Sequence, residues 1–172
     1  MSVLVVHESH FGNSRAVAEA VGAGITDGVG ADGGVVVVDV TEAPDALPDD
    51  LDLLVVGGPT HAFSMSRAAT RHDALSQGAE PGHEARGIRE WLAAVAPSGV
   101  RPDVATFDTR VTKVRRLPGS AARAAGRSVA KHHLGTLVDS ASFFVEDSPG
   151  PLAPGELDRA RAWGRRLATR RE

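Results

Sequence analysis

The feature of this sequence that most constrains its fold is a regular alternation of short β-branched runs with segments whose apolar residues recur at helical spacing. Strands are predicted at residues 3–6, 35–40, 53–56, 104–107 and 137–145. Helices are predicted at residues 14–24, 88–95, 120–132 and 156–169. Strands and helices that alternate in this way form a parallel sheet with right-handed crossovers and helices on both faces. We therefore expect an α/β fold with a doubly wound, parallel sheet.

The length and composition indicate a single domain over residues 1–172. The chain has 172 residues, 42% of them hydrophobic and 24% charged, which is enough to bury one substantial core and shows no sign of disorder. One stretch is unusual, because about residues 61–87 separate a predicted strand from its helix, a longer connection than such folds usually have. A binding loop or lid explains this stretch as well as a solvated insertion with a short helix near residues 67–74.

The charge balance and the residue types exclude several functions. The formal net charge of -3 gives no general attraction to nucleic acid, which is not an expected partner. The chain has no cysteine, so thiol chemistry and iron–sulfur clusters are excluded, and any redox chemistry needs a bound cofactor. No apolar run approaches the roughly 20 residues of a membrane span, and no basic leader precedes the first strand. We expect no membrane insertion and a cytoplasmic location, while the oligomeric state is not predictable.

An anion-binding loop is predicted between the first strand and the first helix. Residues 7–14, HESHFGNS, follow a buried strand directly, which places their backbone N–H groups at the positive end of a helix dipole. Ser9 and Ser14 can donate O–H hydrogen bonds, and Gly12 allows a close backbone approach or a positive φ. No lysine follows the glycine as in a P-loop, and no GxGxxG is present. Sites for nucleoside triphosphates and dinucleotides are therefore not expected.

The segment VLVVHESHFGNSRAVAEAV resembles the start of the flavodoxin family, whose first loop has the form S/T-x-T-G-N-T and binds the phosphate of flavin mononucleotide (FMN). The resemblance implies that six consecutive residues hold the phosphate: Ser9, His10, Phe11, Gly12, Asn13 and Ser14. Phe11 replaces the family's small hydroxyl residue, which removes one side-chain donor and leaves the backbone donors. The resemblance also implies a flavodoxin-like three-layer sandwich with strand order 2-1-3-4-5 and a ligand site beyond the carboxyl ends of the strands.

A second run, VVGGPTHAF, follows the third predicted strand and is similar to the family's second flavin loop. The similarity implies that Pro59 and Thr60 contact the flavin. It also implies an aromatic ring stacked on the isoalloxazine, a place that His61 or Phe63 would have to take.

The run FDTRV stands where the family has its third flavin loop. The resemblance implies contacts from Asp108, Thr109 and Arg110, although the chain has no tyrosine to supply the family's second stacking ring. A positive charge from Arg110 beside the ring would favour an anionic reduced flavin and raise its reduction potential.

The function that the resemblance implies is FMN-dependent redox chemistry, either electron transfer or reduction of a quinone or other small molecule. Its partner would be a redox protein or a small-molecule acceptor. The long connection favours a reductase, and the modest net charge disfavours an electron carrier, because carriers of this family are strongly acidic. The alternative is a flavin-free binding or regulatory domain of the same fold, which the missing tyrosine and the unusual third loop suggest.

Two other chemistries find little support in the residues. The seven histidines include no pair at i, i+4 spacing, and no carboxylate cluster accompanies them, so no metal site is expected. Ser9 lies between a strand and a helix, as a hydrolase nucleophile would, but the chain contains no GxSxG sequence. Phosphate binding is the better interpretation of Ser9.

Overall fold

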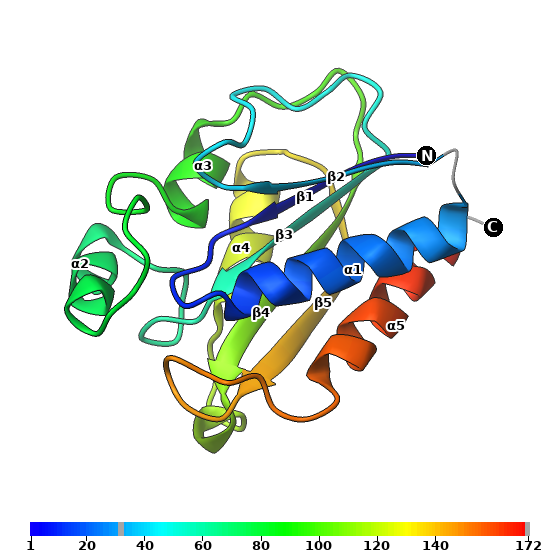
Figure 1. The fold of residues 1–172 in the computed structure, drawn as a ribbon. Helices are drawn as coiled ribbons and strands as arrows, with labels where there is room; N and C mark the ends of the chain where they lie inside the picture. Colours follow the sequence, from blue (N-terminus) through cyan, green and yellow to red (C-terminus); the bar gives the residue numbers. More distant parts are fainter. Residues whose placement is uncertain (31–32, 171–172) are drawn as a thin grey trace.

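The computed structural model describes residues 1–30 and 33–170. A five-stranded parallel sheet in the order β2-β1-β3-β4-β5 forms its centre (Figure 1). The strands are β1 (Ser2–His7), β2 (Gly34–Asp39), β3 (Leu53–Pro59), β4 (Asp103–Val111) and β5 (Thr136–Val145). The helices are α1 (Asn13–Val29), α2 (Ala68–Ser76), α3 (Ile88–Ala94), α4 (Ala121–Lys131) and α5 (Glu156–Thr169), and a 3-10 turn spans Thr112–Val114. The predicted fold class and strand order are confirmed.

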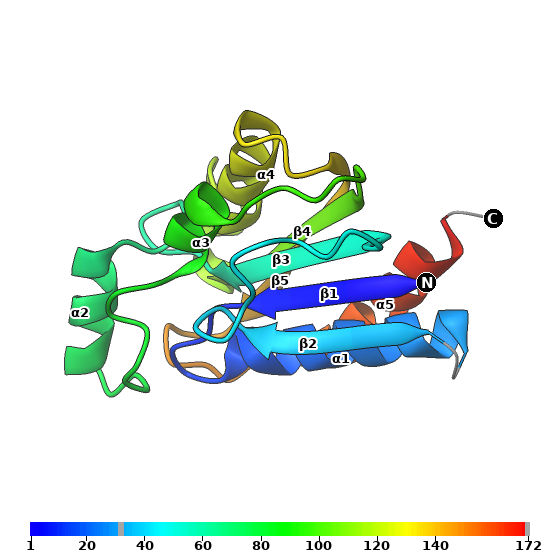
Figure 2. The same cartoon turned by 90° about the horizontal axis from the view of Figure 1, so that it is seen from above.

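Helices cover both faces of the sheet, with α1 and α5 on one side and α3 and α4 on the other (Figure 2). Successive residues of a strand point to opposite faces, so Val3 and Val5 of β1 pack toward α1 and α5, while Leu4 and Val6 join the core beneath α3 and α4. The continuous apolar run of β1 is thus explained by burial on both faces, as the sequence predicted.

Helices α1 and α5 approach each other closely because each has a glycine packed against the backbone of the other helix. A Cβ atom on Gly24 of α1 would overlap the backbone of Arg161, and one on Gly164 of α5 would overlap the carbonyl oxygen of Val21. Both glycines are buried. The close contact anchors α1, whose first turn forms part of the predicted anion-binding loop.

Strand β4 is longer than the sequence predicted, and this changes the place of the third flavin loop. The prediction ended the strand at residue 107, whereas the structure continues it to Val111. Asp108 pairs with Gly58 of β3 and with Ser142 of β5, so both neighbouring strands support the extension. Residues 108–110 are therefore strand residues, and the irregular segment begins after Val111.

The long connection between β3 and α3 contains α2, a short helix close to where the sequence suggested one. Figures 1 and 2 both place α2 beyond the carboxyl ends of β1 and β3, away from the two helical layers. Parallel α/β sheets bind their ligands at this edge. The connection therefore stands beside the predicted site.

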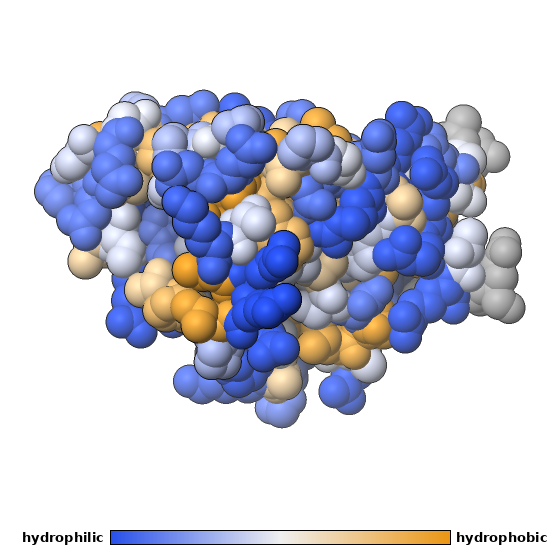
Figure 3. Space-filling model, turned by 90° about the horizontal axis from the view of Figure 1, so that it is seen from below, coloured by the Kyte–Doolittle hydropathy of each residue, from blue (hydrophilic) through white to orange (hydrophobic). Residues whose placement is uncertain are grey.

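The surface is mainly hydrophilic on the face shown in Figure 3, where hydrophobic residues form small, separate patches. Within residues 1–30 and 33–170, no helix combines the length and apolar character needed to cross a membrane.

Candidate functional site

The loop between β1 and α1 has the backbone geometry of an anion site. Gly12 is the N-cap of α1 and has a φ of 86°, a left-handed conformation that favours glycine. No side chain caps the helix, and within the described chain no hydrogen bond uses the backbone N–H groups of residues 10–14 as donors. A Cβ atom on Gly12 would meet nothing within 4 Å. These N–H groups are consequently free to bind an anion at the positive end of the helix.

A small pocket of about 50 Å³ lies over this loop. Ser9 is 1% exposed and lines the pocket, yet its Oγ atom has no hydrogen-bond partner. A buried hydroxyl without a partner is costly, so the pocket favours a ligand that accepts a hydrogen bond there. The volume equals that of a few water molecules and suits a phosphate group, whereas a complete cofactor needs several hundred Å³.

Most of the predicted site residues line this pocket. Ser14 donates to or accepts from Thr109 through a hydrogen bond of 2.7 Å between their hydroxyl groups, which joins α1 to β4. The predicted residues found in the pocket wall are Ser9, His10, Phe11, Asn13, Ser14, Pro59, Thr60, His61, Thr109 and Arg110. Sequence reasoning missed Val111, Val145 and Ser148, because the last two come from β5 and the loop after it, which the topology alone brings to this edge.

Arg110 places a positive charge against the pocket. Its Nη2 atom donates to the carbonyl oxygens of Val114 and Leu117, at 2.7 and 3.1 Å, and so holds the segment after β4. Its Nε atom is buried and has no partner. The guanidinium group is therefore anchored through Nη2, and its buried Nε–H is available to an anion.

Three predicted residues, Gly12, Phe63 and Asp108, lie outside the pocket wall. Asp108 is fully buried, and its Oδ2 accepts a hydrogen bond of 3.0 Å from the backbone N–H of Ala122, so it caps the start of α4. Phe63 is 48% exposed and lies in a tight turn that paired backbone hydrogen bonds between His61 and Ser64 close. Both central residues of this turn have positive φ, 46° for Ala62 and 64° for Phe63.

The chain after β3 touches β4 itself, the start of α4 and the segment between them. The backbone N–H of Thr60 donates to the carbonyl oxygen of Thr109, and its Oγ1 accepts from the N–H of Ala121, both at 2.9 Å. Farther along, a Cβ atom on Gly119 would lie only 2.8 Å from the carbonyl oxygen of Phe63. The space between the turn after β3 and the segment before α4 is thus filled by the chain itself.

A second, larger pocket of about 280 Å³ opens on the other side of His61. It lies between the end of β3 and α2, and it shares Phe11, Thr60, His61 and Ser148 with the first pocket. Its remaining walls are Ala62, Thr70, Asp73, Ala74 and Gln77.

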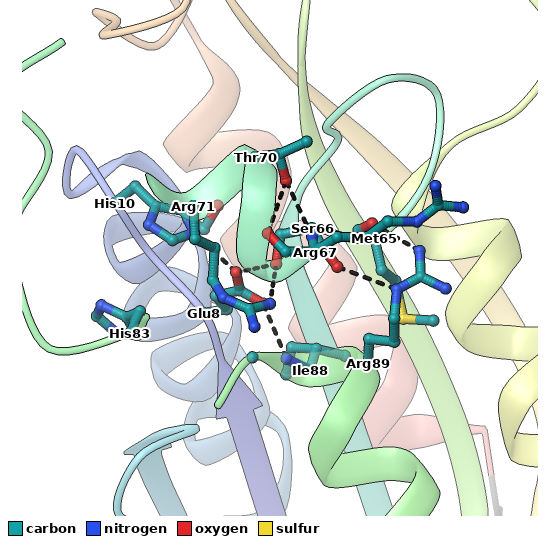
Figure 4. A network of polar contacts seen from close by, with 12 residues as sticks. Glu8, His10, Met65, Ser66, Arg67, Thr70, Arg71, His83, Ile88 and Arg89 are labelled. Carbon is teal, nitrogen blue, oxygen red and sulfur yellow. Dashed lines mark hydrogen bonds and ion pairs between the residues drawn. The ribbon is translucent and has the colours of Figure 1, made fainter. Parts of the chain in front are cut away.

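A buried polar network has Glu8 at its centre and includes His10, which lines the first pocket (Figure 4). Glu8 is 1% exposed and receives hydrogen bonds from the Oγ of Ser66 and from the backbone N–H of Ile88, the latter at 2.8 Å. The Nε2 of His10 lies 2.7 Å from the same carboxylate. The loop between β1 and α1, the long connection and α3 therefore meet at one carboxylate.

Arg71 of α2 extends this network. Its Nη1 atom donates to Ser66 at 3.0 Å and lies 3.1 Å from Glu90, while its other nitrogens donate to the carbonyl oxygen of Glu84. The side chain is almost completely buried, which is uncommon for arginine and requires such partners. The sequence prediction missed Glu8 and Ser66. Only Glu8 left a signal, as a carboxylate directly after a buried strand.

The network shifts the pKa values of several groups. Burial raises the pKa of Glu8, but hydrogen bonds from His10, Ser66 and Ile88 outweigh burial and leave that pKa below its ordinary value. Burial and the nearby His10 lower the pKa of His61. The charged form of Glu8 and the neutral form of His61 are thus favoured beside the pockets.

A histidine–aspartate pair lies at the edge of the network. The Nε2 of His83 lies 2.9 Å from Asp39, and this hydrogen bond raises the pKa of His83. Burial raises the pKa of Asp39, but hydrogen bonds from His83 and Thr41 outweigh it and hold that pKa well below its ordinary value. Among the residues that the structure describes, no group of three His, Cys, Asp or Glu side chains could hold a metal ion.

Comparison with known proteins identifies the fold through structure and not through sequence. No protein-family model matches the chain, and no curated protein matches it. A flavodoxin from the domain Archaea superimposes with a TM-score of 0.63 at 15% identity, covering 99% of this chain and 98% of its own. Oxidised flavodoxin 2 from Bacillus cereus gives 0.64 at 13% identity, with 99% of both chains covered. A flavone reductase gives 0.57 at 16% identity, with 98% of this chain and 62% of the reductase covered. The chain therefore has the flavodoxin-like fold.

Proposed function

We propose that this protein binds FMN and acts as a flavodoxin-like redox protein, with the FMN phosphate in the pocket over residues 9–14. The observation that carries the proposal is the Oγ atom of Ser9, which is buried and unpartnered beside a row of free backbone N–H groups. A phosphate monoester supplies oxygen acceptors for both kinds of donor. The flavodoxin structures with the same fold support FMN as the ester.

The residues at the pocket would share the work of binding. Ser9 and the N–H groups of residues 10–14 would donate hydrogen bonds to the phosphate, and Arg110 would add a positive charge and its free Nε–H. Ser14 and Thr109 would fix the position of α1 against β4 through their hydroxyl contact. Bound FMN would supply one-electron and two-electron transfer, which no side chain of a cysteine-free chain provides.

Within this class, we favour reduction of a quinone or another small molecule over electron transfer to a protein. The long connection that contains α2 stands beside the phosphate site and would partly cover a bound ring, as a reductase requires. The formal net charge of -3 is small for a carrier that docks by its acidity. A redox protein remains the partner expected for a carrier.

The second candidate is a flavin-free domain that binds a smaller phosphate-bearing ligand. The observation in its favour is the contact between the segments after β3 and β4, which leaves only about 50 Å³ over the phosphate loop.

The experiment that separates the two is a visible absorption spectrum of the purified protein, repeated after addition of FMN and desalting. Retained flavin bands support the redox protein. A colourless protein after both steps rejects FMN and favours the flavin-free domain.

Replacement of Ser9 by alanine tests the phosphate contact itself. Loss of one hydrogen bond to a charged group costs about 1.5–3 kcal/mol, so FMN affinity should fall roughly tenfold to a hundredfold. Fluorescence titration with FMN measures the change, and Ser98→Ala, at an exposed loop far from the pocket walls, is the matched control. Equal affinities for both variants would refute the proposed role of Ser9.

A further inference from the structure

The place of the flavin ring is a separate question from the place of its phosphate. A planar tricyclic ring needs an open slot next to the phosphate pocket. The turn after β3 and the segment before α4 already touch, because Gly119 packs against Phe63 and Thr60 accepts a hydrogen bond from Ala121 at the start of α4. A ring between Phe63 and Gly119 would have to separate them.

The pocket against α2 needs no such change. It measures about 280 Å³ and shares four wall residues with the phosphate pocket, so a ligand anchored at Ser9 can reach it directly. Phe11 and His61 belong to both walls. These are aromatic side chains, which provide flat faces for stacking. Phe11 is also the residue that departs from the family's phosphate loop.

The far wall of this pocket is polar in a way that matches one edge of a flavin. The side chains of Asp73 and Gln77 in the α2 segment are exposed at the pocket and have no hydrogen-bond or ion-pair partner in the described chain. The pyrimidine edge of isoalloxazine carries one N–H donor between two carbonyl acceptors. A carboxylate can accept from that N–H, and an amide can donate to a carbonyl.

We propose that the ring of the bound cofactor lies between Phe11, His61 and α2, with its pyrimidine edge toward Asp73 and Gln77. The proposal rests on FMN binding as proposed above. It gives the long connection a role, because α2 would form a wall of the ring site. It also assigns a stacking place to Phe11.

Two tryptophan variants locate the ring. Gln77→Trp places an indole at the rim of the pocket against α2, and Leu117→Trp places one on the segment after β4, where Leu117 is 47% exposed. An indole in contact with a flavin quenches its fluorescence by electron transfer. At saturating FMN, we expect severalfold lower flavin fluorescence in Gln77→Trp than in wild type, and no change in Leu117→Trp. Circular dichroism confirms that both variants fold.

Asp73→Asn tests the chemistry of the edge. A carboxylate beside the ring disfavours added negative charge, so its removal should raise the reduction potential of the bound flavin. FMN affinity should fall roughly tenfold, as for loss of one charge-assisted hydrogen bond. The matched control is Asp158→Asn, an exposed carboxylate on α5 that lines neither pocket.

The outcomes distinguish the two proposals. If the wild-type protein takes up no FMN, the proposed function fails and the ring site with it. If it takes up FMN, but Leu117→Trp quenches, Gln77→Trp does not, and Asp73→Asn leaves the potential unchanged, only the ring position is wrong.

Discussion

At the scale of single residues, Glu8 shows how a buried charge is accommodated. Its carboxylate lies among Ser66, Ile88 and His10, and these contacts keep it ionised despite burial. The arrangement leaves few lone pairs unused, which is the condition under which a buried carboxylate is tolerated. A change of charge at this position should therefore alter both the free energy of unfolding and the affinity for a ligand.

Glu8→Gln should lower the free energy of unfolding by about 2–3 kcal/mol, because charge-assisted hydrogen bonds to Ser66 and Ile88 are weakened and the amide introduces donors opposite other donors. Urea denaturation measures the loss. Glu80→Gln is the control, since Glu80 forms a half-exposed ion pair with Arg15 and its loss should cost about 0–1 kcal/mol. Similar losses in the two variants would contradict the role of Glu8.

The pair of His83 and Asp39 makes a prediction about pH. The pKa of His83 is raised in the folded protein, so the stabilisation by its charged form is complete below the unfolded value of 6.5 and is lost as the pH rises above it. His7 and His61 have lowered pKa values and act in the opposite sense. The informative quantity is thus the difference in unfolding free energy between wild type and His83→Gln. This difference should shrink as the pH is raised from 6.5, and a constant difference would be evidence against the pair.

At the scale of elements, the crossing of α1 and α5 makes a prediction whose sign opposes helix propensity. Glycine to alanine within a helix normally stabilises by about 1 kcal/mol. At Gly24 the added Cβ would overlap the backbone of Arg161, and backbone atoms cannot move aside cheaply. Gly24→Ala should instead destabilise by about 1–3 kcal/mol, as overpacking does.

The measurement is again urea denaturation, with Ala23→Gly as the companion variant. Ala23 is exposed on the same helix, so its replacement should cost only the propensity difference of about 1 kcal/mol. A gain of stability in Gly24→Ala would mean that the two helices can separate at no cost.

Local patterns account for the elements that the sequence predicted well. The β-branched runs and helical spacing of residues 3–6 and 14–24 identified β1, α1 and the loop between them, because these signals are contained in a few neighbouring residues. The continuation of β4 through Asp108, Thr109 and Arg110 was not predictable in this way. Polar residues rarely indicate a strand, and the pairing with β3 and β5 that makes them one is a long-range contact.

The candidate site divides along the same line. The loop at residues 9–14 could be located from the sequence because its glycine, its hydroxyl residues and its position before a helix are contiguous, and its binding of phosphate stays a prediction. The pocket against α2 could not, since it depends on how a long connection folds back over Phe11. The contacts of Arg71 with Ser66, Glu84 and Glu90 hold that connection in place, and no local sequence pattern predicts them.

At the scale of the whole molecule, ligand binding should raise thermal stability if the proposed site exists. A ligand at a hundred times its dissociation constant stabilises the folded state by about 2.7 kcal/mol. For a domain of this size, the melting temperature should rise by roughly 5–10 °C with FMN. Differential scanning calorimetry with riboflavin, which lacks the phosphate, provides the comparison. An equal shift with riboflavin would show that the phosphate, and with it the loop at residues 9–14, contributes nothing to binding.

The buried arginine of α2 also determines how the molecule opens. Arg71 cannot leave its site without breaking its contacts with Ser66, Glu84 and Glu90. Ser66 in turn donates a hydrogen bond to Glu8, which lies between β1 and the loop at residues 9–14. Segments tied in this way unfold together, as one cooperative unit, and their protected amide protons share one free energy of opening. The loop between β1 and α1 and the connection that contains α2 thus share one opening equilibrium, so a ligand bound at the loop, as proposed, would also slow hydrogen exchange in the connection.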